Sequence, residues 1–299
     1  MFTFITAVRH PSTAASYVRI ESLLRRSLRS ICNQSSQNFS VIVVCNQVPA
    51  NPHPDKRIRY LLTPEFPVDT NDLLYRTRTD KGFKIALGLA AARELQPTHV
   101  MIFDADDFVH RHIVAYSDQH SSSPGWHVDR GFVYDKRTHL VSPLVRFSEI
   151  CGTSHIIAYH LVEPNGVTPT STREQVLNAL GEEYVQLVLG AHPFIVDFFA
   201  ARSHIFSPLP FPGAVYQRGT GENDRQWFVA PGFPRPPSVR FCTDFGIEIS
   251  GSDKLRAFGS WPRSAISHLR RTMTNSREPQ DVAVLDAYRT QVLRIASKE

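Results

Sequence analysis

The stretch Thr98-His-Val-Met-Ile-Phe-Asp-Ala-Asp-Asp107 decides the fold that we predict for this chain. Residues 100–103 are apolar at every position, which is typical of a short strand buried on both faces. Three carboxylates, Asp104, Asp106 and Asp107, come directly after it. Carboxylates this close repel one another, so they indicate a divalent cation site or a polar cap. The alternative is a strand followed by an Asp-rich turn, with Asp107 capping the next helix.

The first hundred residues alternate between apolar runs and amphipathic stretches. Strands are expected at 2–8, 38–45, 58–62 and 100–103, with helices at 16–31 and 85–95. This alternation predicts an α/β fold with a doubly wound, Rossmann-like, mostly parallel sheet flanked by helices. Ligands of such sheets bind just past the carboxyl ends of the strands, where the three acids fall.

The rest of the chain lacks this regular alternation and predicts a mixed region of strands and helices. We expect a hairpin with arms at 126–134 and 139–145, a strand at 151–159, a helix at 174–189 broken near Gly181, and a short helix at 194–203. A Pro-rich stretch at 231–237 reads as a linker. Amphipathic helices with a basic bias are expected at 263–273 and 281–295.

Composition limits the class of protein. Of the 299 residues, 42% are hydrophobic and 20% are charged, which is ordinary for a globular protein. No apolar run approaches the roughly 20 residues that span a bilayer. The four cysteines form no Cys-x-x-Cys pair, which favours a reducing cytoplasm. The net charge of +5 suits a phosphate-bearing ligand or an anionic surface, while the scattered basic residues argue against nucleic acid.

Three stretches resemble the GT-A glycosyltransferases, most of all their bacterial family-2-type members. Ser27-Leu-Arg-Ser-Ile-Cys-Asn-Gln34 with the strand at 38–44 is similar to the family's first helix and second strand. Asp80-Lys-Gly82 with its Ala-rich helix is similar to the segment before the metal motif. Phe103-Asp-Ala-Asp-Asp107 is similar to the metal (DXD) motif itself. Together they cover roughly the first 110 residues, and the later resemblance is one of layout.

The resemblance implies a GT-A domain with two halves. Residues 1–110 would bind the nucleotide sugar, 111–237 would form the acceptor side, and 238–299 would be a largely helical C-terminal extension. The implied activity is hexosyltransferase-like: a sugar passes from a nucleotide-diphosphate donor, a UDP-sugar being favoured, to a glycan or lipid-linked acceptor, as in polysaccharide biosynthesis. A bound Mn²⁺ or Mg²⁺ would offset the charge of the departing diphosphate.

The same resemblance suggests which residues do this work. Asp104 and Asp106 would hold the metal, with His192 as a third ligand. The family often has an acid where Cys45-Asn46 stands here, so Asn46 would recognise the base through its amide. The expected donor contacts are Thr6, Ala7, Arg9, Asn46, Lys81, Gly82, Asp104, Ala105 and Asp106.

The base that accepts the acceptor's proton has three candidates. Inverting family members place an acidic pair where this chain has Ala191-His-Pro193, so His192 is the first candidate. Asp197, one helical turn on, is the second, and Glu222 in Gly-Thr-Gly-Glu-Asn223 is the third. Without the acidic pair, an inverting and a retaining mechanism both stay open.

Other functions stay in view. A nucleotidyltransferase acting on a sugar phosphate uses a similar sheet, but it normally carries a Gly-rich basic loop after the first strand, unlike Ala7-Val-Arg-His-Pro11. A haloacid-dehalogenase-like phosphatase also has an Asp-x-Asp motif, but there it follows the N-terminal strand, whereas here it follows the fourth expected strand. A degenerate member could bind a sugar nucleotide or glycan without turnover. The basic C-terminal tail suggests peripheral contact with the cytoplasmic face of an anionic membrane.

Overall fold

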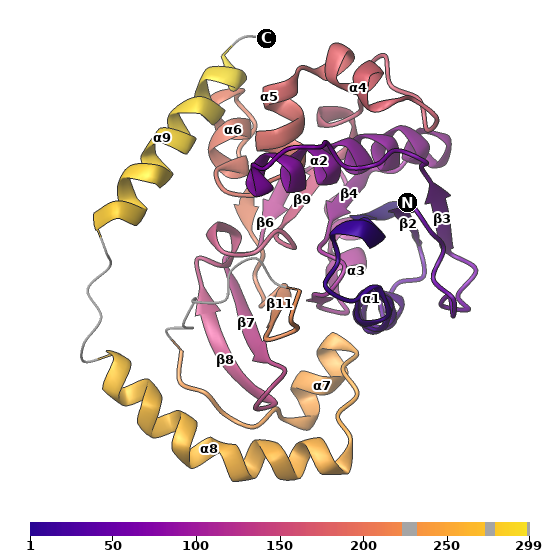
Figure 1. The fold of residues 1–299 in the computed structure, drawn as a ribbon. Helices are drawn as coiled ribbons and strands as arrows, with labels where there is room; N and C mark the ends of the chain where they lie inside the picture. The colour runs from indigo at the N-terminus through magenta and orange to yellow at the C-terminus, as the bar shows by residue number, and fades with distance from the viewer. Residues whose placement is uncertain (223–231, 273–278, 298–299) are drawn as a thin grey trace.

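The structure, a computed structural model, describes residues 1–222, 232–272 and 279–297, with side chains for all of these except 270–272 and 279–285. Its centre is a seven-stranded sheet in the order β10-β6-β9-β4-β1-β2-β3 (Figure 1). The strands β1 (Phe2–Ala7), β2 (Phe39–Cys45), β3 (Ile58–Leu62) and β4 (His99–Ile102) are mutually parallel. The predicted α/β fold with a mostly parallel sheet is confirmed.

The other strands of this sheet come from the second half of the chain. β9 (His155–Ala158) pairs antiparallel with both β4 and β6 (Gly125–His127), and β10 (Ser207–Pro208) pairs parallel with β6. The antiparallel strand β9 therefore joins the parallel unit to the later segments. It also brings the residues just before it beside the end of β4, where the acids lie.

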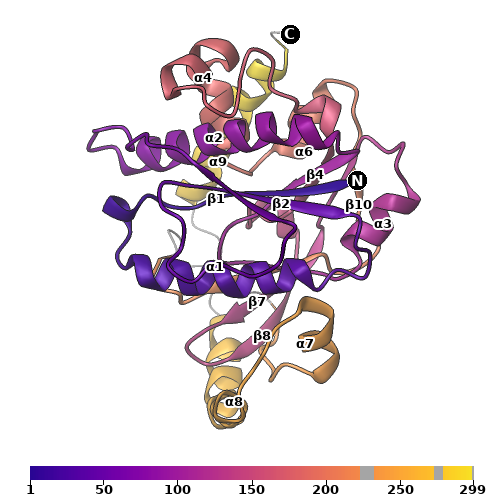
Figure 2. The ribbon, with the colours of Figure 1, turned by 90° about the vertical axis from the view of Figure 1, so that its right-hand side faces the viewer.

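Two helical layers cover the sheet, as Figure 2 shows, with α2 (Leu73–Ala92) over one face and α1 (Tyr17–Cys32) over the other. The first layer also contains α4 (Arg173–Leu180), α5 (Glu182–Tyr184), a π-helical turn (Val185–Leu189), α6 (Ile195–Ala201) and α9 (Pro279–Ala296). α3 (Ile113–Gln119) lies on the side of α1. A separate apolar core fills the space on each side of the sheet.

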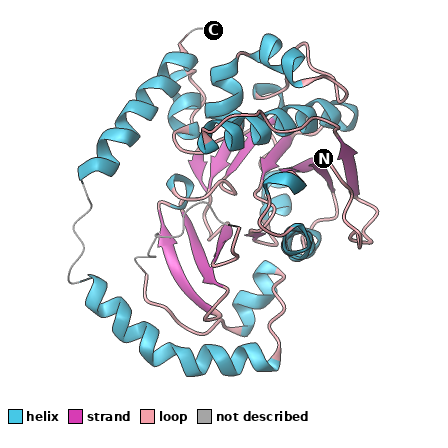
Figure 3. Ribbon diagram, viewed as in Figure 1, coloured by secondary structure: helices cyan, strands magenta, loops and turns pink. Residues whose placement is uncertain are grey.

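A second sheet stands beside the first (Figure 3). It contains β5 (Phe108–Val109), β11 (Ala214–Arg218), β7 (Arg130–Asp135) and β8 (Leu140–Val145), in that order. α7 (Val239–Phe245) packs on it through Phe241 and Phe245, and α8 (Gly251–Thr272) comes next. Residue 231 of the expected linker is outside the described part, and Arg235 forms an antiparallel bridge with Val141 of β8.

Several predicted boundaries were wrong. The helix expected at 85–95 begins at Leu73, where Asp72 caps it by accepting a hydrogen bond from the Tyr75 amide, so Asp80-Lys-Gly82 lies inside it. The arm expected at 126–134 divides into β6 and β7, which belong to different sheets. The strand β5, and not a helix, comes directly after Asp107, so the proposed helix cap at Asp107 was also wrong. The break near Gly181 was placed correctly.

Candidate functional site

A cavity of about 420 Å³ lies at the carboxyl ends of β1 and β4. This is the edge where ligands of open α/β sheets bind. Further walls come from the first turns of α2, the segments 150–152 and 190–193, Tyr216 on β11, and Glu222. Eight of the predicted site residues line it: Ala7, Arg9, Lys81, Asp104, Ala105, Asp106, His192 and Glu222.

Asp104 faces the cavity and forms an ion pair with Lys81 of α2. Its backbone amide donates to Thr153 Oγ1 at 2.9 Å, which holds the end of β4 against the segment before β9. Burial opposes the charged form of this carboxyl, but Lys81 and, more weakly, His192 outweigh it and lower the pKa of Asp104. The side chains of Asp104 and Lys81 are 31% and 23% exposed, so both can reach a ligand in the cavity.

Asp107 points the other way, into the protein, and is buried. Its carboxylate accepts hydrogen bonds from Cys151 Sγ at 2.9 Å, Thr153 Oγ1 at 2.6 Å and the Gln217 amide at 3.0 Å. Burial and then the charge of Asp104 raise the pKa of Asp107 to about 7 despite these donors. Asp107 therefore joins the end of β4 to β11 and to the segment before β9.

Asp106 lines the cavity, and its environment favours the neutral carboxyl group. Burial raises the pKa of Asp106 well above its ordinary value, and the charges of Asp107 and Asp104 raise it further. Its backbone carbonyl accepts from Gln217 Nε2 at 2.7 Å, which holds the turn in place. A cation near this carboxyl group would favour its charged form, because opposite charges stabilise each other.

The residue types at the cavity suit a hard divalent cation. Asp104 and Asp106 line it, and carboxylate oxygen is the ligand that Mg²⁺ and Mn²⁺ prefer. Among the residues that the structure describes, the group whose ligand atoms lie within 4.8 Å of one another is Asp104, Asp107 and Cys151, and neither Asp106 nor His192 belongs to it. Burial raises the pKa of the Cys151 thiol well above its ordinary value, which makes it a poor ligand.

Positive side chains line the same cavity as the acids. Arg9 lies just past β1, and Arg76, Arg78 and Lys81 come from the first half of α2. The Arg78 guanidinium lies 4.7 Å from the ring centre of Tyr288 on α9, a cation–π contact that orients it. Acids and cations in one cavity suit a ligand that carries phosphate and, with it, a metal ion.

His192 reaches the cavity because α2 and the segment 190–193 approach closely. A Cβ on Gly190 would lie 2.1 Å from the Arg78 carbonyl oxygen, so glycine is needed at this contact. Asp197 does not reach the cavity. It is on α6, where its carboxylate forms an ion pair with Arg289 of α9 at 2.7 Å. The structure therefore separates two of the proposed bases.

Glu222 lines the cavity, but its carboxylate is already engaged. It accepts hydrogen bonds from the backbone amides of Ala15 at 3.2 Å and Ser16 at 2.9 Å, just before α1 begins. Arg9 lies 3.6 Å from it in an ion pair. These contacts satisfy amide groups at the start of a helix, so they assign Glu222 a structural task.

Three predicted donor contacts lie away from the cavity lining: Thr6, Asn46 and Gly82. Thr6 is buried within β1. A Cβ on Gly82 would lie 1.9 Å from the Val185 carbonyl oxygen, so this glycine lets α2 pack against the π-helical turn. Asn46 Nδ2 donates to the carbonyl oxygens of Thr63 at 2.9 Å and Glu65 at 2.8 Å. Its amide thus holds the segment after β3.

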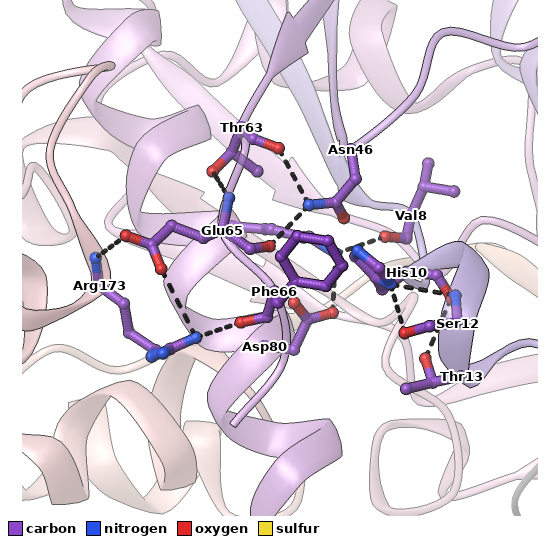
Figure 4. A network of polar contacts seen from close by, with 11 residues as sticks. Val8, His10, Ser12, Thr13, Asn46, Thr63, Glu65, Phe66, Asp80 and Arg173 are labelled. Carbon is purple, nitrogen blue, oxygen red and sulfur yellow. Dashed lines mark hydrogen bonds and ion pairs between the residues drawn. The ribbon is translucent and has the colours of Figure 1, made fainter. Parts of the chain in front are cut away.

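Figure 4 shows the network that this segment joins. Arg173 forms an ion pair with Glu65 at 3.8 Å and also donates to the Phe66 carbonyl oxygen. The Phe66 ring lies 4.8 Å from that of His10, just past β1. The segment after β3 is therefore held close to the cavity, whose lining includes Pro67.

The sequence did not reveal Arg76, Arg78 and Tyr216 as cavity residues. The two arginines were missed because α2 was expected to start at residue 85. Had Asp72 been taken as a helix cap, the spacing of Leu73, Thr77 and Lys81 would have placed one face over the strand ends. Tyr216 comes from another sheet, and no sequence spacing relates it to the acids.

The chain has structural neighbours but no match at the level of sequence. No protein-family profile and no curated protein matches it. Three similar solved structures are all of S. aureus TarS. The first is 13% identical to this chain with a TM-score of 0.35, and the match covers 72% of this chain and 36% of that chain. TarS 1–349 in complex with UDP-GlcNAc is 12% identical with a TM-score of 0.38 (99% of this chain and 89% of that chain), and TarS 1–349 is 11% identical with a TM-score of 0.36 (99% of this chain and 88% of that chain). With TM-scores below 0.5, these similarities do not establish a shared site or activity.

Proposed function

We propose that this protein is a glycosyltransferase that moves a sugar from a nucleotide-diphosphate donor, a UDP-sugar first, to a glycan or lipid-linked acceptor. The observation that carries the proposal is the cavity at the ends of β1 and β4, which is lined by Asp104 and Asp106 together with the cations Arg9, Arg76, Arg78 and Lys81. A nucleotide sugar needs this combination, since its diphosphate is anionic and binds together with a divalent cation.

Asp104 and Asp106 would hold Mn²⁺ or Mg²⁺, which when bound stabilises the negative charge of the leaving diphosphate. Lys81 forms an ion pair with Asp104 and lines the cavity, where it would contact phosphate. The arginines would bind the diphosphate directly, because a guanidinium matches phosphate oxygens in pairs. These contacts hold the donor with its reacting carbon in the cavity.

His192 is the residue that we propose as the base. Asp197 forms an ion pair outside the cavity, and Glu222 accepts hydrogen bonds from two backbone amides. His192 lies on the cavity wall, and an imidazole accepts a proton readily near neutral pH. In this proposal it takes the proton of the acceptor hydroxyl as that oxygen attacks the sugar.

The first experiment is a thermal-shift screen of UDP-, GDP-, CMP- and dTDP-sugars with and without Mn²⁺. We expect metal-dependent stabilisation by a diphospho-sugar, which Asp104→Asn and Asp106→Asn should each abolish. Asp286→Asn, which changes an exposed acid on α9, is the control. Each shift is measured against the melting temperature of the same ligand-free variant, because removing the partner of Lys81 also affects stability. Metal dependence that survives both changes would refute the site.

The second experiment separates binding from turnover. His192→Ala should lower the release of free nucleotide by roughly a hundredfold while donor binding is retained. His160→Ala, at an exposed histidine outside this cavity, should leave both unchanged. Unchanged turnover in His192→Ala would contradict the proposed base and leave the donor site intact.

A further inference from the structure

Helix α8 presents an apolar face that the described fold leaves exposed. Four of its side chains form this face: Leu255, Phe258, Ile266 and Leu269, which are 75%, 62%, 54% and 51% exposed. At about 100° per residue, they fall within an arc of roughly 80° around the helix axis. We call these four residues the α8 stripe. It extends along roughly 20 Å of helix, with Trp261 at its border.

The opposite side of α8 is attached to the protein, so the stripe faces outward. Ala257 is fully buried, and Ser260 Oγ donates to the Thr138 carbonyl oxygen at 3.0 Å. Asp253 lies 3.3 Å from His139, in the connection between β7 and β8. These contacts orient the helix on the second sheet. Figure 1 shows α8 at the outer edge of the molecule.

Basic side chains border the stripe. Lys254, Arg256 and Arg263 are exposed, and Arg256 and Arg263 lie on the same side of the helix between the stripe and the attached face. Asp253 is the one acid in the sequence of residues 251–269, and it lies beside His139. The exposed surface of this part of the helix is therefore apolar along its middle and positive along its edge.

Helix α9, the other long helix of the tail, is used differently. Tyr288, Val292 and Ile295 are buried in the core around α2 and α6. Tyr288 also donates a hydrogen bond to the Leu187 carbonyl oxygen at 2.8 Å, and Arg289 forms an ion pair with Asp197. The apolar face of α9 is thus covered by this chain itself, while the described residues leave the α8 stripe exposed.

We propose that α8 binds the surface of an anionic membrane. An exposed helix with Leu, Phe, Ile and Trp on one face and Lys or Arg beside it lies in the plane of the lipid headgroups. Its apolar side chains then leave water, and its cations attract anionic lipids. The charge beside the stripe favours this partner over a second copy of α8, because two such edges would repel each other. No helix in the described part of the chain is long and apolar enough to cross a membrane.

The test is sedimentation of the full chain with lipid vesicles in the absence of any donor, so its result does not depend on the proposed function. We expect binding to vesicles of phosphatidylcholine that contain about one third phosphatidylglycerol, and at least tenfold weaker binding to pure phosphatidylcholine. Raising the salt to about 0.5 M should weaken binding, because salt screens the basic edge. Arg256→Gln with Arg263→Gln should lower the partition coefficient by about tenfold or more.

The stripe itself is tested by Phe258→Asp with Ile266→Asp. We expect this variant to lose vesicle binding by more than tenfold and to keep its melting temperature, since both side chains are exposed. Ile205→Asp is the matched control, because Ile205 is 67% exposed but lies before β10, outside α8. Equal binding by the two variants, or no binding by the unchanged protein, would overturn the proposal. So would a dimer in solution that Phe258→Asp with Ile266→Asp dissociates, because the stripe would then be a contact between copies.

Discussion

Gly152→Ala tests the placement of Asp104 without changing any charged group. Gly152 lines the cavity, and a Cβ built there would lie 2.6 Å from Asp104 Oδ2 and 3.1 Å from its Cγ and Oδ1. Ordinary contact begins at about 3.4 Å, so the carboxylate must move by roughly 0.8 Å or rotate away. It would then leave the position from which it pairs with Lys81 and from which it would contact the proposed cation.

A displacement of this size at a reacting centre costs about a hundredfold in rate. We therefore expect Gly152→Ala to lose most of the Mn²⁺-dependent stabilisation by a UDP-sugar and to release nucleotide about a hundredfold more slowly. The cost to folding should be smaller, about 1 to 3 kcal/mol, because one methyl group is added beside a partly exposed side chain that can move.

The assay compares donor-induced melting shifts and nucleotide release in Gly152→Ala and Gly259→Ala. Gly259 is the control because nothing lies within 4 Å of its added Cβ. If Gly152→Ala binds and turns over donor like the unchanged protein, while Asp104→Asn does not, the inferred position of the carboxylate is wrong. Far-UV circular dichroism will show whether Gly152→Ala is folded. If it is not, Asp104→Glu replaces it in the assay, because this variant displaces the carboxylate by lengthening the acid. Gly152→Ser would not help, since it adds the same Cβ.

Three further predictions concern stability and the neighbouring groups, each measured by urea unfolding. Burial lowers the pKa of His155 to about 3 and of His110 to about 4, so the unfolded chain binds protons below about pH 6.5 that the native chain does not. Stability should therefore fall by about 1.6 kcal/mol per histidine between pH 6.5 and 5, and a flat profile would contradict this. Lys84→Met should cost about 3 to 5 kcal/mol, because the buried Lys84 ammonium donates to Val8 O at 2.9 Å and Asp80 Oδ2 at 2.7 Å; a loss below about 1 kcal/mol would show that the pair is dispensable. Glu222→Gln should cost about 1 to 3 kcal/mol of stability, since its amide nitrogen would face a backbone amide of Ala15 or Ser16. Donor turnover should change less than tenfold, and a hundredfold loss of turnover in a folded protein would restore Glu222 as the base.

The sequence predicted those elements whose residues face the core. The apolar strands β1, β2 and β4 and the amphipathic helix α1 were expected within a few residues of their observed bounds. The first half of α2 was missed because Arg76, Arg78 and Lys81 face the cavity, so residues 73–82 show no apolar stripe. Hydrophobic periodicity detects helices through the face that they bury, and a helix segment beside a ligand site lacks that face.

The predicted site residues divide into those that were predicted from local motifs and those that were predicted from the family layout. Asp104, Asp106 and Lys81 were predicted because they belong to local stretches that resemble a known motif, and all three line the cavity. Asn46 and Asp197 were assigned to the site by layout, but one binds the segment after β3 and the other Arg289. Position in a family layout does not determine the partner of a polar side chain, because that partner comes from segments whose approach depends on packing.

The neighbouring acids Asp106 and Asp107 show what determines which of two adjacent carboxylates lines the cavity and which is buried. Asp106 lies in the turn after β4 and lines the cavity, whereas Asp107 comes directly before β5 and is buried. The inward carboxylate requires several donors, because a buried charge without them is unstable. Cys151, Thr153 and the Gln217 amide supply them to Asp107, from 44, 46 and 110 residues away in the sequence. Asp106 lines the cavity because these distant segments bind its neighbour, and the local sequence contains no sign of that choice.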